Sequence, residues 1–334
     1  MAKVVLPVEN EPTNAAFTGA SLVQPSRYRG ERTAPVMAAS TSTAPSAQRL
    51  CLLAVHAHPD DEASKGAATV HRYHREGVHT VLVCCTGGEQ GEILNPARDR
   101  PEIRERLPEV RREELTRSTD VIGYEEVVML GYLDSGMPGT PANEDPRCFA
   151  RAHLHEAVAR LVEAIRRTRP QVIVTYPDDQ QGYPHPDHLR VHEISVLAFD
   201  AAGDPGAYPD AGDPWQPLKL YYSVWSRARM VAVHEAFLAL GLQSPLDSRW
   251  FERPDMDDRV TTRVDVAAFG AVRRNALLAH ATQIDPESPF WFGLPPEVAD
   301  QVYVHDDYIR ARSLVDAPLP EDDLFAGVRG SGPA

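Results

Sequence analysis

The sequence predicts an α/β protein with a Rossmann-like, doubly wound and mainly parallel sheet that carries helices on both faces. Two observations support this prediction. Short apolar runs alternate with helical stretches from about residue 50 onward, which is typical of sheets built from strand–helix–strand units. The runs are also apolar almost throughout, as expected for strands that are covered on both faces.

The elements follow one another in a regular order along the first part of the chain. We expect a strand at 50–55 (LCLLAV), a helix at 65–75, a strand at 80–85 (TVLVCC), a helix at 108–121 and a strand at 126–131 (EVVMLG). The helix expected at 150–168 has the clearest amphipathic pattern. Its apolar residues recur at i, i+4, i+7, i+8 and i+11: Leu154, Val158, Leu161, Val162 and Ile165. A fourth buried strand, QVIVTY at 171–176, follows directly.

The last third of the chain is less regular. After a Pro-, Gly- and Asp-rich loop at 203–217, we expect an alternating segment at 219–226, a helix at 227–240, a strand at 259–266 and a helix at 267–280. We predict that residues 48–334 form a single domain, without an internal repeat. Residues 1–47 are rich in Ala, Ser, Thr and Pro without periodicity, and a segment of this composition is expected to be a disordered tail.

Composition excludes several classes of function. The 334 residues include 34 Lys and Arg against 48 Asp and Glu, a net charge of −14, so neither a nucleic acid nor an anionic membrane is an expected partner. The four cysteines form no CxxC motif, which argues against a disulfide framework and a Cys-ligated zinc finger. Without a leader-like or membrane-spanning apolar run, we expect a soluble cytoplasmic protein that acts on a small molecule. Its oligomeric state is not predicted.

Polar loops follow each of the four strands predicted first. They cover residues 56–62, 86–92, 132–136 and 182–188. In open α/β sheets, ligands bind outside the carboxyl ends of the strands. We therefore expect the four loops to converge on one cleft.

Two of these loops contain residues that bind metals. His58 and Asp61 are three positions apart around Pro59, and His185 and His188 repeat that spacing. Two histidines and one aspartate form a catalytic metal site that leaves a position open for water and lowers its pKa to roughly 7. The spacing does not decide which later histidine is the ligand, and the donor set suits both Zn²⁺ and Fe²⁺.

The neighbouring residues complete a hydrolytic site. Asp60 leaves the same turn as Asp61 and is the candidate general base. The histidine that does not bind metal, together with Tyr183, is positioned to donate to an oxygen that gains charge. The alternative is that these aspartates merely cap helices, but four polar clusters at four strand ends argue against it. Motifs of nucleotide-binding proteins, serine hydrolases and HExxH metalloproteases are absent from the sequence.

Five strings resemble the LmbE-like, zinc-dependent N-acetylglucosaminyl deacetylase (PIG-L) superfamily, and within it an amidase branch. They are HAHPDDEASKGAAT, CTGGEQGEILNPA, LGYLDSGMP, QGYPHPDHLRVHEISV and LAHATQIDP. The resemblance spans about Leu50 to Phe325 and implies the LmbE-like fold.

The resemblance also assigns roles at the centre of the site. It implies three zinc ligands, His58, Asp61 and His188, and thus selects His188 over His185. Asp60 would be the general base that returns the proton to the leaving amine, while His185 and Tyr183 would stabilise the oxyanion. Asp187 would hold a histidine in its tautomer, or would be a solvated aspartate at the start of a helix.

Further residues are candidates for binding substrate. The resemblance implies that Arg111 and Asp134 bind the glucosaminyl-inositol part, and that Lys65 marks the amidase branch. The alternatives are a solvated helix face for Arg111, a backbone-bonded turn for Asp134 and an exposed helix position for Lys65. Glu89 and Gln90 lie in a glycine-flanked loop and are expected to line the cleft.

Gln283, in the HATQID string, is a weaker candidate for the same cleft. Specificity for the sulfur substituent is expected to come from the loops at 203–217 and 286–296. In the second loop, Phe290, Trp291 and Phe292 form either an apolar lip or part of the core.

The function implied by the resemblance is hydrolysis of the amide between the cysteinyl group and glucosamine in mycothiol S-conjugates. The products would be a mercapturic acid and glucosaminyl-inositol, a detoxification reaction. The alternatives are the deacetylase that removes acetate from N-acetylglucosaminyl-inositol in mycothiol biosynthesis, an amidase acting on mycothiol conjugates in antibiotic biosynthesis, and a non-catalytic module.

Overall fold

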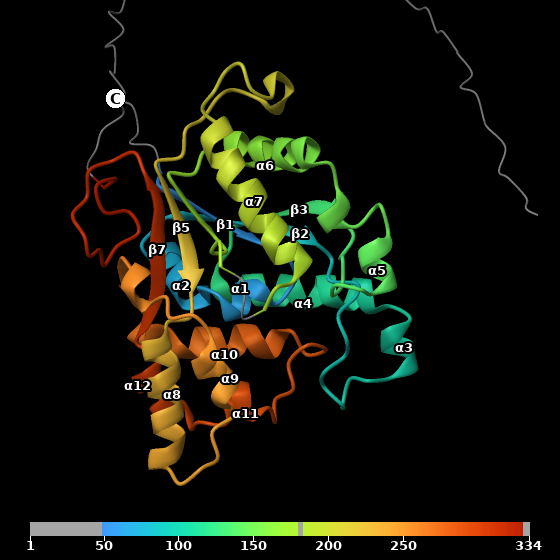
Figure 1. The fold of residues 1–334 in the computed structure, drawn as a ribbon, viewed down its shortest axis with the longest axis vertical. Coiled ribbons are helices and arrows are strands. Elements are labelled where there is room, and N and C mark those ends of the chain that lie inside the picture. The colour runs from blue at the N-terminus through green and yellow to red at the C-terminus, as the bar shows by residue number, and fades with distance from the viewer. Residues whose placement is uncertain (1–48, 180–182, 330–334) are drawn as a thin grey trace, which may run out of the picture. The chain divides into compact units, whose positions relative to one another are not determined.

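The computed structural model describes residues 49–179 and 183–329, so the predicted tail at 1–47 lies outside the described residues. A sheet of seven strands in the order β3-β2-β1-β4-β5-β7-β6 forms the centre of the fold (Figure 1). The strands are β1 Cys51–His56, β2 His79–Thr86, β3 Glu126–Tyr132, β4 Val172–Thr175, β5 Lys219–Val224, β6 Thr262–Asp265 and β7 His305–Ser313.

Five strands, β1 to β5, pair in parallel, whereas β7 pairs antiparallel with both β5 and β6. Strand β1 lies in the middle of the parallel part: Leu52 is opposite Thr80 of β2 on one side and Val172 of β4 on the other. Strands β2 and β3 are therefore added on one side of β1, and β4 and β5 are added later on the other side. This is the doubly wound topology, and the predicted fold class is confirmed.

Twelve α-helices connect the strands within the described residues. They are α1 Asp61–Ser64, α2 Ala67–Arg75, α3 Pro101–Arg104, α4 Leu107–Ile122, α5 Pro141–Glu144, α6 Leu154–Thr168, α7 Pro186–Ala201, α8 Arg227–Ala239, α9 Ser248–Glu252, α10 Gly270–Ala279, α11 Pro289–Phe292 and α12 Pro296–Val302. None of them is long and apolar enough to span a bilayer.

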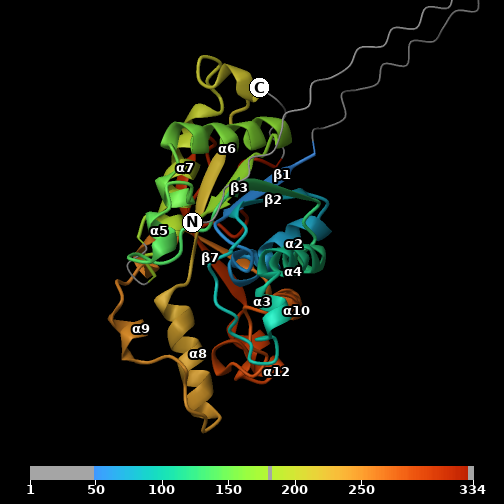
Figure 2. The ribbon, with the colours of Figure 1, turned by 90° about the vertical axis from the view of Figure 1, so that its right-hand side faces the viewer.

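Helices cover both faces of the sheet, as predicted. Alternate residues of β1 point to opposite faces: Leu53 packs in a core with α6 and α7, and Leu52 packs in a core with α2, α4 and α10. Figures 1 and 2 show α6 and α7 on one side of the sheet and α2 and α4 on the other. A smaller cluster around Met230, Val233 and Phe237 joins α8 to the segments that follow it.

Several elements differ from the prediction. The helix expected from residue 150 begins at Leu154, because a 3₁₀ turn at Phe149–Arg151 precedes it. The strand expected at 259–266 is limited to Thr262–Asp265. Strand β7 was not predicted, since its sequence HDDYIRARS lacks an apolar run. Asp307, Tyr308 and Ile309 are its buried residues, whereas its other charged residues are only partly buried or exposed.

Candidate metal centre and its cavity

The candidate site lies at the carboxyl ends of β1 and β4, where the strand order reverses direction. His58 follows β1, Asp61 opens α1, and His188 lies in the first turn of α7. Helix α7 begins sharply because Pro186 occupies its first turn and His185 caps it, accepting the backbone N–H of Asp187. The local sequence thus turns His188 toward the end of β1.

Three of the predicted ligands form one group. The Nδ1 atom of His58 and the Nε2 atom of His188 each lie 3.5 Å from the Oδ2 atom of Asp61. Donor atoms of the three side chains lie within 4.8 Å of one another, and all three residues are buried. Two imidazoles and one carboxylate facing a common point are the donor set of a catalytic metal site. The residues present therefore fit a divalent cation.

The second nitrogen of His58 faces two further carboxylates. Its Nε2 atom lies 3.1 Å from Asp187 and 3.6 Å from Asp134. Burial lowers the pKa of His58, but the surrounding carboxylates outweigh burial and hold this pKa well above its ordinary value. Asp187 is fully buried and also accepts the backbone N–H of Ser135 at 2.9 Å. Of the two alternatives for Asp187, contact with a histidine is therefore the one seen, and that histidine is His58.

Two residues hold Asp61, one of the predicted ligands, in place. The Tyr176 hydroxyl donates to its Oδ2 atom at 2.6 Å, and its ring stacks on His188 with centroids 4.4 Å apart. The Lys65 ammonium lies 2.5 Å from its Oδ1 atom. Lys65 is therefore turned toward the site rather than exposed on its helix. Sequence analysis missed Tyr176, because Asp61, to which its hydroxyl donates, lies 115 residues away in the chain.

Asp60, the candidate base, has an unusual backbone conformation with φ 111°. A side chain at positive φ is strained, and such strain persists only where surrounding contacts impose it. The carboxylate of Asp60 lies 3.1 Å from the guanidinium of Arg111. Burial raises the pKa of Asp60 above its ordinary value, and Arg111 opposes this change.

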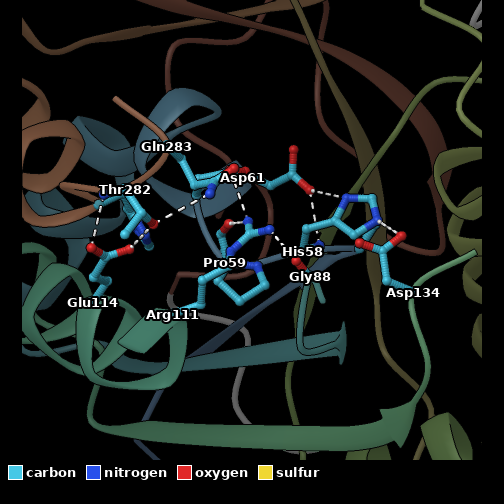
Figure 3. Close-up of polar contacts among 12 residues, drawn as sticks. His58, Pro59, Asp61, Gly88, Arg111, Glu114, Asp134, Thr282 and Gln283 are labelled. Carbon is cyan, nitrogen blue, oxygen red and sulfur yellow. Dashed lines mark hydrogen bonds and ion pairs between the residues drawn. The ribbon is translucent and has the colours of Figure 1, made fainter. Parts of the chain in front are cut away.

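Arg111 is buried and not part of a solvated helix face. It donates to the carbonyl oxygens of Gly88 and Pro59 (Figure 3). It also donates to the carboxylate of Asp60. A side chain at Gly88 would collide with the guanidinium, since a Cβ there would lie 2.4 Å from its Cζ atom. The structure thus places Arg111 against the turn that carries Asp60, while it also lines the cavity.

His185 and Tyr183 line the same cavity as the three predicted ligands. Burial lowers the pKa of His185, and the neighbouring His58 lowers it further. Since the Nδ1 atom of His185 accepts the backbone N–H of Asp187 at 3.2 Å, the proton of the neutral ring is assigned to Nε2. Tyr183 is 53% exposed, and its ring centroid lies 5.9 Å from that of His185.

The predicted residues after β2 and β3 are linked to one another. Asp134 accepts backbone N–H groups from Gly136 at 2.8 Å and Gln90 at 3.2 Å, and its own N–H donates to Glu89 at 3.1 Å. The backbone-bonded turn considered for Asp134 is thus present. Asp134 and Gln90 line the cavity, whereas Glu89 is not among its lining residues.

A buried polar network supports the turn that carries Asp60, and it was not predicted. Glu62 accepts hydrogen bonds from Ser118 and His280 at 2.5 Å each, and its other oxygen accepts the backbone N–H of Asp60 at 2.9 Å. Nearby, Thr282 donates from its backbone and its hydroxyl to the buried Glu114, as Figure 3 shows. These contacts join the HPDDE and HATQID strings.

A cavity of about 910 Å³ opens from the candidate metal-binding group, which consists of His58, Asp61 and His188. Gln283, Phe290 and Trp291 line it, but Phe292 packs against the core instead. The expectation for the loop at 203–217 is wrong: none of its residues lines the cavity. Arg166 of α6 draws this loop away by donating to several of its carbonyl oxygens.

Comparisons with known proteins found a matching family and related sequences. Residues 53–199 match the PIG-L family, described as GlcNAc-PI de-N-acetylase. The mycothiol S-conjugate amidase of Streptomyces coelicolor is 47% identical over 290 residues, covering 84% of this chain and 98% of that protein. The 1D-myo-inositol 2-acetamido-2-deoxy-alpha-D-glucopyranoside deacetylase of Geodermatophilus obscurus is 41% identical over 292 residues, covering 84% and 98%.

Solved structures share the fold at low identity. The N,N'-diacetylchitobiose deacetylase from Pyrococcus horikoshii has a TM-score of 0.55 at 15% identity, covering 79% of this chain and 85% of that one. The 4-carboxy-2-hydroxymuconate hydratase GalB from Pseudomonas putida has a TM-score of 0.54 at 15% identity, covering 81% and 99%. Since a hydratase shares the fold, the fold alone does not define the reaction. The match to the family and the identity to its curated relatives do: the chain belongs to the PIG-L family, whose members are hydrolytic enzymes acting on amide bonds.

Proposed function

We propose that the protein hydrolyses the amide between the cysteinyl group and glucosamine of mycothiol S-conjugates, releasing a mercapturic acid and glucosaminyl-inositol. The observation that carries the proposal is the convergence of His58, Asp61 and His188 beside Asp60 in one cavity. We assign the metal as zinc and the compartment as the cytoplasm. The four cysteines are buried and free, which fits a reducing environment.

In this proposal, each side chain has one task. A zinc ion held by His58, Asp61 and His188 would polarise the amide carbonyl and lower the pKa of water to roughly 7. Asp60 takes the proton of the attacking water and gives it to the amine as the C–N bond breaks. Its carboxylate is kept in place by Arg111, 3.1 Å away.

The carbonyl oxygen gains negative charge as water adds. His185 is a neutral donor at Nε2, because its other nitrogen is already an acceptor for the N–H of Asp187. The hydroxyl of Tyr183 supplies a second donor. Removing one donor of this kind typically lowers the rate about a hundredfold or more.

The choice of the amidase over the deacetylase has two supports. The amidase relative is 47% identical to this chain, against 41% for the deacetylase relative. Lys65, which marks the amidase branch in the sequence, lies against the ligand Asp61. The sugar would lie toward Asp134 and Gln90, whose loops follow β3 and β2. The similarity to deacetylases makes release of acetate from N-acetylglucosaminyl-inositol the second candidate.

A side-by-side assay tests the proposal. The protein, loaded with Zn²⁺ or with Fe²⁺, is incubated with a fluorescent mycothiol S-conjugate and with N-acetylglucosaminyl-inositol, and the products are identified by mass. We expect much faster cleavage of the conjugate, with zinc as the better metal. Preference for the acetylated sugar would instead establish the biosynthetic deacetylase.

A further inference from the structure

The cavity extends well beyond the metal-binding group, toward the carboxyl end of β5. This part of it, the aromatic arm, is lined by four aromatic residues and two methionines: Trp225, Met230, Trp250, Met256, Phe290 and Trp291. Trp225 directly follows β5 and the others come from segments later in the chain. Three of the chain's four tryptophans therefore line one cavity.

The aromatic arm is a packed structure. The rings of Trp225 and Phe290 are stacked with centroids 5.9 Å apart, and those of Trp250 and Phe290 are stacked at 5.4 Å. The guanidinium of Arg253 lies 3.7 Å from the centroid of Trp250. Arg227 donates to the carbonyl oxygens of Phe251 and Arg253 and thereby holds the segment that carries Trp250. A site whose aromatic groups are fixed beforehand loses little entropy when it binds a ligand.

The strand order separates the aromatic arm from the polar end of the cavity. Along the sheet edge, the ends of β3 and β2 carry Asp134 and Gln90, the ends of β1 and β4 carry the metal-binding group, and the end of β5 carries Trp225. Neighbouring strands lie about 4.8 Å apart, so the end of β5 is roughly 10 Å from the end of β1. The metal-binding group therefore lies between a polar region and one lined mainly by aromatic side chains and methionines, with Arg227 and Arg253 beside them.

An amide substrate has two halves, which leave the carbonyl carbon in different directions. If the sugar half lies toward Asp134, the acyl half is directed toward β5. In a cysteinyl group, only Cα and Cβ separate the sulfur from the carbonyl carbon, so a substituent on sulfur begins near the metal-binding group and extends along the arm. An acetyl group ends at its methyl and would not reach the arm.

We propose that the aromatic arm binds the sulfur substituent of the conjugate and selects planar aromatic substituents, with Trp250 and Phe290 as specificity-determining residues. The proposal rests on the amidase function above. Aromatic rings and methionines offer stacking and soft apolar contacts without a demand for hydrogen bonds. Such a surface accepts substituents of varied chemistry, provided that they are flat and apolar.

The test compares two mycothiol S-conjugates that differ in one group, S-methyl and S-naphthylmethyl. The quantity measured is the ratio of kcat/KM for the naphthylmethyl over the methyl conjugate, in the wild type, Trp250→Ala and Phe290→Ala. We expect each variant to lower this ratio about tenfold, as loss of a stacked aromatic contact does. The control is Trp215→Ala, because Trp215 lies outside the cavity and donates to Pro170. It should leave the ratio unchanged.

Binding is measured without turnover as well. Calorimetry with N-acetyl-S-naphthylmethylcysteine, the product acid, should show weaker binding to Trp250→Ala than to wild type. An unchanged ratio and unchanged product binding in both arm variants would overturn the inference while leaving the amidase function intact. A wild type that cleaves neither conjugate yet releases acetate from N-acetylglucosaminyl-inositol would overturn both.

Discussion

Replacing Arg111 with leucine tests how the turn that carries Asp60 is held in place. The side chain of Arg111 is 2% exposed and donates to Gly88, Pro59 and Asp60. Leucine would leave two carbonyl oxygens without this donor, at about 1–3 kcal/mol for each that stays buried and unpaired. The lost ion pair adds less, because the carboxylate of Asp60 is 30% exposed and water screens it. We expect the free energy of unfolding to fall by about 3 kcal/mol.

The same substitution should change the pH dependence of catalysis. Burial raises the pKa of Asp60 and Arg111 lowers it, so losing Arg111 raises this pKa further. A general base must be ionised, and the acidic limb of the kcat profile should therefore move to higher pH. Urea unfolding and pH-rate profiles measure the two effects. The matched control is Arg112→Leu, since Arg112 is exposed on the same helix.

Two results would refute this reasoning. Unfolding that matches the wild type would mean that Arg111 does not support the turn. A higher KM with an unmoved acidic limb would mean that Arg111 acts on the substrate alone.

Three further predictions follow from the same geometry. Asp60→Ala should keep its metal and lose nearly all turnover, and a rate close to normal would refute its role as the base. Asp187→Asn weakens the support of His58 and should lower metal affinity about 10- to 100-fold, as measured by competition with a chelator; an unchanged affinity would contradict the contact. Burial lowers the pKa of His280, but Glu62 outweighs it and the pKa is raised. The ion pair of His280 with Glu62 therefore stabilises the fold fully below the ordinary histidine pKa of about 6.5. This stabilisation is lost as the pH rises through the raised pKa that His280 has in the folded protein. The melting temperature of His280→Phe should fall furthest below the wild type at low pH, with the gap narrowing as pH increases; a constant gap would argue against an ion pair.

The sequence predicted most of the parallel part of the sheet because β1, β2 and β4 are buried on both faces. Leu53 and Val83, for example, lie in apolar runs whose hydrophobicity is visible without any tertiary information. Strand β7 lacked this signal, because its buried Asp307 accepts a hydrogen bond from Ser226 and pairs with arginines from other elements. Such pairing over long sequence distances leaves no local pattern.

The candidate site was predictable where its residues are neighbours in the chain. His58 and Asp61 lie in one turn, and so do His185 and His188. Tyr176, Glu62 and His280 act through partners on other elements, so neither spacing nor periodicity indicated them. The loop at 203–217 was wrongly predicted to contribute to specificity for a related reason. Arg166, which holds the loop away from the cavity, lies on α6 and is distant in the sequence.

The sequence separation of the three predicted metal ligands has a consequence for how the protein matures. His58 and Asp61 follow the first strand of the sheet, whereas His188 arrives only with α7, after β2, β3 and β4 have been synthesised. An emerging chain therefore offers a metal ion two donors at most until β4 has docked beside β1. A metal ion held by all three residues would therefore bind only after the central part of the sheet has formed.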